Sequence, residues 1–293
     1  MYLPAHRTTS SAPSRARAGT LSDHSLCLLK QVLAIPTKSR LEAKMIAWLM
    51  GHFHQRGVQC AVDPSGNVYV TKGRLNQGYY PCVIAHTDSV HDPEPITIAQ
   101  HGDKLIALDL DRRQTGLGGD DKAGIFICLQ LLEQFTTIKA AYFVSEEIGC
   151  VGANACDPTF FQDVGYALEF DSPCQDITSY LCQGVQLFPD SGPFADQFVP
   201  LLSAHGVNRW QNHPFTDACV IKRRFPFPCP NLPAGYFRMH SRQEYVRVSA
   251  VANSLALGSR LITALGPERY EFIHDPNRPS NPAFPVTELR THG

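Results

Sequence analysis

Five short polar segments supply histidines and carboxylates of the kind that bind metal ions. They are His86-Thr87-Asp88, Gly119-Asp120-Asp121-Lys122, Glu146-Glu147, Asp171 and His240. Zinc takes histidine nitrogen and carboxylate oxygen as ligands, and a catalytic zinc ion keeps one position open for water. Two such ions a few ångströms apart can share one carboxylate and stabilise a hydrolytic transition state. The segments therefore indicate an enzyme, with metal-assisted hydrolysis as its chemistry.

Each segment also has an ordinary interpretation when it is taken alone. His86 alone can be an ordinary histidine at a strand end, whereas in a metal site Asp88, two residues on, is expected to hydrogen-bond the other ring nitrogen of His86 and fix its tautomer. The acid pair 120–121 can cap a helix, because carboxylates are favoured at helix N-termini. The acid pair 146–147 can be a solvated strand end, although the nearby Gly149 favours a tighter site. The order of all five segments, each beside an expected strand or helix end, makes a shared metal site the better interpretation.

The two adjacent glutamates can take different tasks because neighbouring side chains point in different directions. Glu147 is expected to bind metal. Glu146 is expected to be the general base, which takes a proton from a metal-activated water and later gives it to the leaving amine. Asp120 is expected to bridge the two metals.

The elements that must position these residues alternate between strands and helices. The expected helices cover residues 21–35, 39–57, 120–135 and 246–266. The expected strands cover residues 58–63, 68–73, 81–88, 96–102, 104–110, 138–147 and 164–173. This order predicts an α/β fold with a mixed, mostly parallel central sheet and helices on both faces. The polar segments follow the C-terminal ends of strands, where ligands bind in such sheets.

The composition is that of a globular protein with a substantial core. The chain has 293 residues, 43% of them hydrophobic and 18% charged, and a formal net charge of −1. This balance gives no indication of a nucleic acid or a membrane surface as a partner, and no run of 18 apolar residues predicts a membrane span. The ten cysteines form no CxxC pair. They are expected to be reduced and to act as small hydrophobic residues, which favours the cytoplasm.

The two ends of the chain differ from its middle. The first 20 residues lack acids and are rich in Ser, Arg and Pro, as in some transit peptides, but they have no apolar region like that of a secretory signal. We expect residues 1–21 to be a disordered extension or to precede the true start. A single catalytic domain is expected over residues 22–266, followed by an irregular tail over residues 267–293.

The order of the five segments resembles that of the co-catalytic zinc exopeptidases. These include peptidase T, the bacterial glutamate carboxypeptidases, the succinyl-diaminopimelate deacylases and the secreted zinc aminopeptidases. The segments GLGGDDKAGI and MHSRQEYVRVS are most similar to the peptidase T branch. The resemblance implies two zinc ions, for which cobalt or manganese can substitute. It implies one ion held by His86, Asp120 and Asp171, another held by Asp120, Glu147 and His240, and a cis peptide bond after Asp120.

The chain departs from peptidase T between the fourth and fifth segments. That branch inserts a lid domain there, whereas only 68 residues separate Asp171 from His240 here. We expect two helices and two strands in this interval, and a fold without a lid. The lid normally supplies groups that hold the substrate. The residues expected to replace them are His213, Asp217, Arg238 and Arg242, because an arginine can pair with a substrate carboxylate.

Four functions are compatible with these residues. The first is a zinc exopeptidase of peptides, as an aminopeptidase. The second is an N-acyl amino acid deacylase or a carboxypeptidase on the same fold. The third is an acyl-transfer enzyme of the glutaminyl cyclase type, which usually works with one zinc ion. The fourth is an inactive relative that acts as a binding module, which the presence of every expected ligand and of the expected base disfavours.

Overall fold

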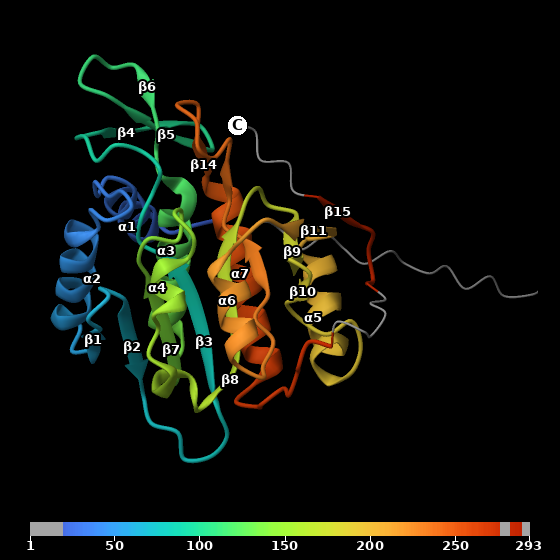
Figure 1. Ribbon diagram of the computed structural model, residues 1–293. Helices are drawn as coiled ribbons and strands as arrows, with labels where there is room; N and C mark the ends of the chain where they lie inside the picture. Colours follow the sequence, from blue (N-terminus) through green and yellow to red (C-terminus); the bar gives the residue numbers. More distant parts are fainter. Residues whose placement is uncertain (1–19, 276–281, 289–293) are drawn as a thin grey trace, which may run out of the picture.

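A large mixed sheet forms the centre of the computed structural model, which describes residues 20–275 and 282–288 (Figure 1). Within these residues the strand order is β1-β2-β7-β3-β8-β12-β9-β11-β15, and β10 pairs with β9. The strands are β1 (Cys60–Val62), β2 (Val68–Lys72), β3 (Tyr80–His86), β7 (Ile138–Phe143), β8 (Val164–Ser172), β9 (Ile177–Cys182), β10 (Val185–Gln186), β11 (Arg209–His213), β12 (Asn231–Pro233) and β15 (Val286–Glu288).

The strands β7, β3 and β8 lie side by side and parallel at the middle of this sheet. Every residue of the three strands is buried. Near-continuous apolar runs such as PCVIA and IKAAYF are typical of parallel strands covered on both faces. The expected mixed α/β fold with a mostly parallel centre is therefore confirmed.

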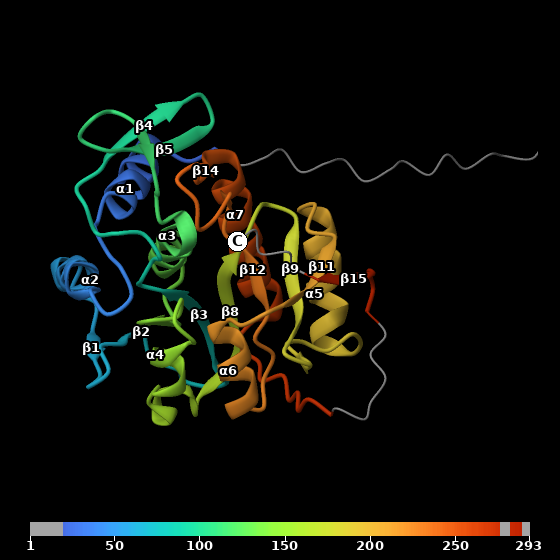
Figure 2. The same ribbon diagram turned by 45° about the horizontal axis from the view of Figure 1, so that its top comes forward.

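Helices cover both faces of the sheet (Figure 2). They are α1 (Asp23–Leu33), α2 (Ala43–Gln55), α3 (Gly119–Gln134), α4 (Val151–Asn154), α5 (Pro193–Ala204), α6 (Asp217–Arg224) and α7 (Val248–Leu265), with a short 3₁₀ helix, η1, at Pro158–Phe161. The helices α1, α3, α7 and α5 contact one another in that order, while α4 and α6 contact each other on the opposite face. The four helices expected from the sequence are all present.

The central helix, α3, is buried from Gly119 through Leu132. Its apolar residues face β3 on one side and the neighbouring helices α1 and α7 on the other. A helix that is apolar all round belongs inside a protein, which fits this position. Because α3 is fixed in this way, its first residues are held at the C-terminal edge of the sheet.

A second, smaller sheet lies above the N-terminal end of α3 in Figure 1. Its strands are β4 (Thr97–His101), β5 (Lys104–Leu108), β6 (Gln114–Thr115), β13 (Tyr236–Phe237) and β14 (Tyr245–Arg247), in the order β13-β14-β5-β4 with β6 beside β5. The expected strand pair over residues 96–110 is confirmed as β4 and β5. This sheet brings the segment before α3 next to the segment around His240.

Two expectations about the later part of the chain are wrong in detail. The interval between Asp171 and His240 contains the two expected helices, but five strands (β9 to β13) instead of two. These strands are short and mix polar with apolar residues, and β12 even contains Pro233, so their pattern is weak. The tail is not wholly irregular, because β15 pairs in parallel with β11. The extension expected at residues 1–21 lies almost entirely outside the described residues.

Among the described helices, α7 is the one that is long and apolar enough to cross a membrane by length and composition alone. Half of its residues are buried, and it packs between α3 and α5. A helix with these contacts serves as a core helix of the fold.

Candidate metal centre

The proposed ligands converge at the C-terminal edge of the central strands. His86 is the last residue of β3, and Asp171 is near the end of β8. Glu147 follows β7, while Asp120 lies at the start of α3 and His240 lies in the loop between β13 and β14. Parallel neighbours end at the same edge of a sheet, so residues distant in sequence meet here.

One carboxylate lies between the two histidines. His86 Nε2 is 3.1 Å from Asp120 Oδ1, and His240 Nε2 is 3.3 Å from Asp120 Oδ2. Asp171 Oδ1 lies 3.4 Å from His86 Nε2, and Glu147 Oε2 lies 3.0 Å from His240 Nε2. Each oxygen of Asp120 thus faces a different histidine, and the Nε2 atom of each histidine also faces an oxygen of a second carboxylate.

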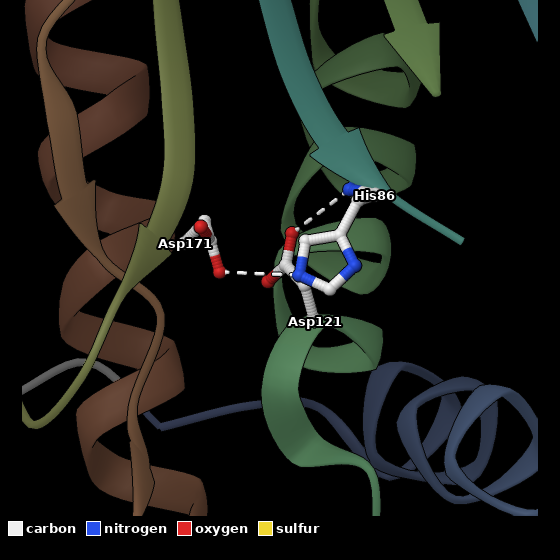
Figure 3. A group of neighbouring side chains, drawn as sticks. All are labelled: His86, Asp121 and Asp171. Atoms are coloured by element: carbon white, nitrogen blue, oxygen red, sulfur yellow. Dashed lines mark hydrogen bonds and ion pairs between the residues drawn. The ribbon is translucent and has the colours of Figure 1, made fainter. Parts of the chain in front are cut away.

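Asp121 also lies beside His86 and Asp171, as Figure 3 shows. Both of its oxygens are already occupied, because Oδ2 accepts a hydrogen bond from the backbone N–H of His86 at 3.2 Å and Oδ1 accepts one from Gly124 at 3.0 Å. Asp121 therefore anchors the start of the helix to the end of β3. The peptide bond between Asp120 and Asp121 is cis, as the resemblance implied.

Asp88 is fully buried behind His86 and holds several site residues. Its carboxylate lies 3.2 Å from His86 Nδ1 and accepts hydrogen bonds from the backbone N–H groups of Glu146, at 2.9 Å, and Glu147, at 3.2 Å. Burial alone would raise the pKa of Asp88, but the hydrogen bond and the charge of His86, and then the hydrogen bonds from Ser39 and from the backbone of Glu146, lower it. An ionised Asp88 fixes the His86 ring so that Nε2 points to the cleft.

The carboxyl groups of the cleft are crowded and poor in positive partners. Burial, and then the charges of Asp171 and Asp217, raise the pKa of Glu146 well above its usual range, although His86 opposes the shift. Burial and the charge of Asp120 also raise the pKa of Asp171, to about 7. Among the described residues, no lysine or arginine lines this cleft. Such a cleft favours a bound cation.

The donor set fits divalent metal ions. Glu147 Oε1 is buried without a hydrogen-bond partner among the described residues, and each histidine Nε2 faces carboxylate oxygens. A cation between these atoms would satisfy all of them, since histidine nitrogen and carboxylate oxygen are ligands that zinc accepts. The groups His86, Asp120 and Glu147, and His86, Asp121 and Asp171, each have ligand atoms within 4.8 Å of one another.

Of the four residues proposed to hold the substrate, His213 lines the cleft, whereas Asp217, Arg238 and Arg242 do not. His213 lines the cleft, together with Phe215 and Met239. Its Nδ1 lies 2.5 Å from the carbonyl oxygen of Phe215, and burial lowers the pKa of His213 to about 4. Asp217 is fully buried and is not among the residues that line the cleft. Burial raises its pKa well above the usual range.

The two arginines do not enter the cleft. Arg238 is exposed, and its Nη1 donates a hydrogen bond to Gln243 at 2.5 Å. Arg242 is 72% exposed at its side chain and lies 3.5 Å from Asp109, in a separate hollow. Neither Arg238 nor Arg242 therefore lies in the cleft, where a substrate carboxylate could pair with it, although both flank His240 in sequence.

Three residues that support the site were not expected from the sequence. Glu42 accepts hydrogen bonds from the backbone N–H and the hydroxyl of Ser145, at 3.0 and 2.8 Å. Ser39 Oγ donates to Asp88 at 2.7 Å. Glu244 accepts three hydrogen bonds from the segment before Asp120 and from Asp120 itself. No local pattern marks Glu42 or Ser39, whereas Glu244 lies inside the segment that carries His240.

Comparison with known proteins gives the fold of the chain. No family model and no curated protein sequence matches it. The structure is similar to aminopeptidase PepT from Bacillus cereus, with a TM-score of 0.73 and 15% identity over 84% of this chain and 99% of that one. It is similar to a tripeptidase from Staphylococcus aureus, with a TM-score of 0.68 and 13% identity over 85% and 100% of the two chains.

A third similar structure is an aminopeptidase from the archaeon Desulfurococcus kamchatkensis. Its TM-score is 0.63, at 13% identity over 83% of this chain and 96% of that one. The three matches each span most of both chains, so the likeness concerns the whole architecture. The chain therefore has the fold of these aminopeptidase and tripeptidase structures.

Proposed function

We propose that the protein is a metal-dependent exopeptidase that removes the amino-terminal residue of peptides. The observation that carries the proposal is the position of Asp120, which presents one oxygen to His86 and the other to His240. A carboxylate shared in this way is what a pair of metal ions requires of its bridge. Similar structures that are themselves aminopeptidases or tripeptidases support the peptidase class.

The proposed ligands form two sets that share Asp120. One ion would be held by His86, Asp120 and Asp171, and the other by Asp120, Glu147 and His240. Two bound divalent ions supply positive charge that polarises the substrate carbonyl and lowers the pKa of water. Zinc fits both sets, and cobalt or manganese are the expected substitutes.

Glu146 is the proposed general base. It is 3% exposed, and no described lysine or arginine lines its cleft. A carboxyl group with a raised pKa can accept a proton from the attacking water and return it to the leaving amine nitrogen. Asp88 supports this role, because it holds the backbone N–H of Glu146 and so fixes where the side chain begins.

The lining of the cleft favours recognition of a free amino group. A carbonyl oxygen only accepts hydrogen bonds, so Nδ1 of His213 carries the proton that it shares with Phe215. Its Nε2 then presents a lone pair, which suits an N–H donor of the substrate. A free carboxylate would instead need a cation, and Arg238 and Arg242 make their contacts elsewhere. These observations support an aminopeptidase over a carboxypeptidase or a deacylase.

The first expected result concerns metal content. Purified protein reconstituted with zinc should hold close to two zinc ions per chain by elemental analysis, because the five ligands form two sets around one bridge. Dialysis against a chelator should remove both the metal and the peptidase activity. Fully active protein with a stable content of one ion would contradict the paired centre and favour chemistry of the glutaminyl cyclase type.

The second expected result concerns the end of the substrate that is held. A dipeptide with a free amino group should be cleaved, its C-amidated form should be cleaved at a similar kcat/KM, and its N-acetylated form should be cleaved poorly. The dipeptide itself is the control. If acetylation is tolerated and amidation stops turnover, the enzyme is a carboxypeptidase or a deacylase, and the aminopeptidase proposal is wrong.

We also propose a single catalytic domain over residues 22–266 without a lid, located in a reducing cytoplasm. The interval between Asp171 and His240 contributes strands to both sheets, which supports one domain. All ten cysteines are free, which suits a reducing compartment.

A further inference from the structure

Glu244 is a buried carboxylate that has no task in the reaction proposed above. It lies four residues after His240, just before β14, and is fully buried. Its Oε1 accepts a hydrogen bond from the backbone N–H of Asp120 at 3.1 Å. Its Oε2 accepts hydrogen bonds from the backbone N–H groups of Leu117, at 3.1 Å, and Gly118, at 2.7 Å. The side chain thus ties the loop of one proposed ligand to the loop of another.

A third ligand-bearing segment reaches the same carboxylate. His91, five residues after His86, places its Nε2 2.9 Å from Glu244 Oε2. The chain that leaves β3 therefore meets Glu244 as well. The chain beside three of the five polar segments thus comes together at the Glu244 side chain, although these segments are up to 154 residues apart in sequence.

The loop over residues 117–120, which is hydrogen-bonded to Glu244, is also restrained by other contacts. Lys122 Nζ donates a hydrogen bond to the carbonyl oxygen of Leu117 at 3.2 Å. The peptide group between Leu117 and Gly118 is therefore hydrogen-bonded at its carbonyl oxygen by Lys122 and at its N–H by Glu244. A Cβ added to Gly119 would lie 2.7 Å from a methyl carbon of Val246 and 3.3 Å from Glu244 Oε1. A buried charge is tolerated only when it is paired and hydrogen-bonded, so the carboxylate and its donors fix each other.

We infer that Glu244 is a positioning residue that sets the metal affinity of the centre by holding the Asp120 and His240 loops in one arrangement. This inference rests on the proposed function, since it takes Asp120 and His240 as metal ligands. Groups that orient ligands without touching the metal typically contribute a factor of roughly 10–100 to metal affinity. Glu244 acts on the backbone of a ligand that both ions share, so its loss should weaken both.

The variant that tests this is Glu244→Gln. Glutamine has nearly the same size as glutamate, but it has one side-chain oxygen, whereas the three backbone N–H groups donate to two oxygens in Glu244. Its NH₂ group would place a donor against a backbone N–H, which is also a donor. We expect the apparent Kd for zinc to rise roughly 10–100-fold in competition with a chromogenic chelator. The visible absorption of the cobalt-loaded variant should also differ from that of the wild type, because the ligand arrangement changes.

The matched control is Asp103→Asn. Asp103 accepts hydrogen bonds from the backbone N–H and hydroxyl of Ser249, at 2.8 and 2.6 Å, and from Arg247 at 3.2 Å. It stabilises the start of α7 and contacts no proposed metal ligand. This control should lower the melting temperature of the metal-free protein and leave the zinc Kd unchanged. An unchanged zinc Kd in Glu244→Gln, or an equal weakening in the control, overturns the role of Glu244.

A measurement on the wild type covers the case in which Glu244→Gln does not fold. Hydrogen exchange of the amides of Leu117, Gly118 and Asp120 in the metal-free protein should be slow, because Glu244 accepts from all three. Exchange as fast as in an exposed loop overturns the inference. Failure of the wild type to bind zinc at all would instead overturn the proposed function, so the two failures are distinguishable.

Discussion

Replacement of Glu146 by glutamine is expected to abolish turnover while the protein keeps both metal ions. Loss of a general base typically costs on the order of 10²–10⁴ in rate, and more when the same group moves a proton twice. Glutamine has the size of glutamate but cannot accept and return a proton. Metal should be retained because the proposed ligands are other residues, and because Asp88 still holds the backbone N–H at this position.

The measurement is kcat on a free dipeptide together with zinc content per chain. Glu133→Gln is the matched control, because Glu133 is a partly exposed glutamate paired with Arg56, outside the cleft. The control should keep wild-type activity and metal. Glu146→Asp should recover part of the lost rate, since it restores a carboxylate one methylene short. Activity of Glu146→Gln within a few-fold of wild type would show that another group is the base.

The sequence predicts the central part of the fold well because that part has strong local signals. The runs that become β3, β7 and β8 are nearly continuous and apolar, interrupted only by Lys139 in β7 and Glu169 in β8, and a histidine or an acid lies at the end of each strand or within three residues after it. Such a run has to be buried, and the polar residue that follows it has to lie at the edge. The main features of the candidate site follow from the ends of three strands and the start of one helix.

The parts that the sequence does not predict depend on contacts between distant segments. The strand β12 forms because Asn231 pairs with β8 on one side and β9 on the other, and its three residues carry no periodic pattern. Arg242 is next but one to His240, yet its side chain extends to Asp109. Nearness in sequence to a ligand therefore does not place a side chain in the cleft.

The supporting carboxylates show the same limit. Glu42 lies more than a hundred residues before the Ser145 backbone that it holds, and Glu244 lies more than a hundred residues after Asp120. In sequence each is an ordinary acid near a helix or a strand. Their role exists only once the fold has brought a ligand loop within hydrogen-bond distance.

Replacement of Asp120 by alanine is expected to remove both metal ions and all activity. The two proposed sets would each lose one of three protein ligands, leaving His86 with Asp171 and Glu147 with His240. The loss in affinity should exceed the roughly 10–100-fold that follows removal of an outer partner. By contrast, Glu147→Ala and His240→Ala each remove a ligand of one set, so they should lose activity and one of the two ions.

The decisive comparison for the Asp120 prediction is Asp121→Asn, because Asp121 also lies within reach of His86 and Asp171. Asparagine keeps one oxygen for Gly124 or His86, so the start of α3 should still form. If Asp120 is the bridge, Asp121→Asn retains close to two zinc ions and zinc still raises its melting temperature, since a ligand that binds only the folded state stabilises it.

If Asp121→Asn loses metal while Asp120→Ala retains it, Asp121 is the ligand and the assignment of the bridge is wrong. The two carboxylates can be distinguished in this way because their oxygens have different partners: those of Asp121 accept backbone hydrogen bonds, while each oxygen of Asp120 faces a histidine nitrogen.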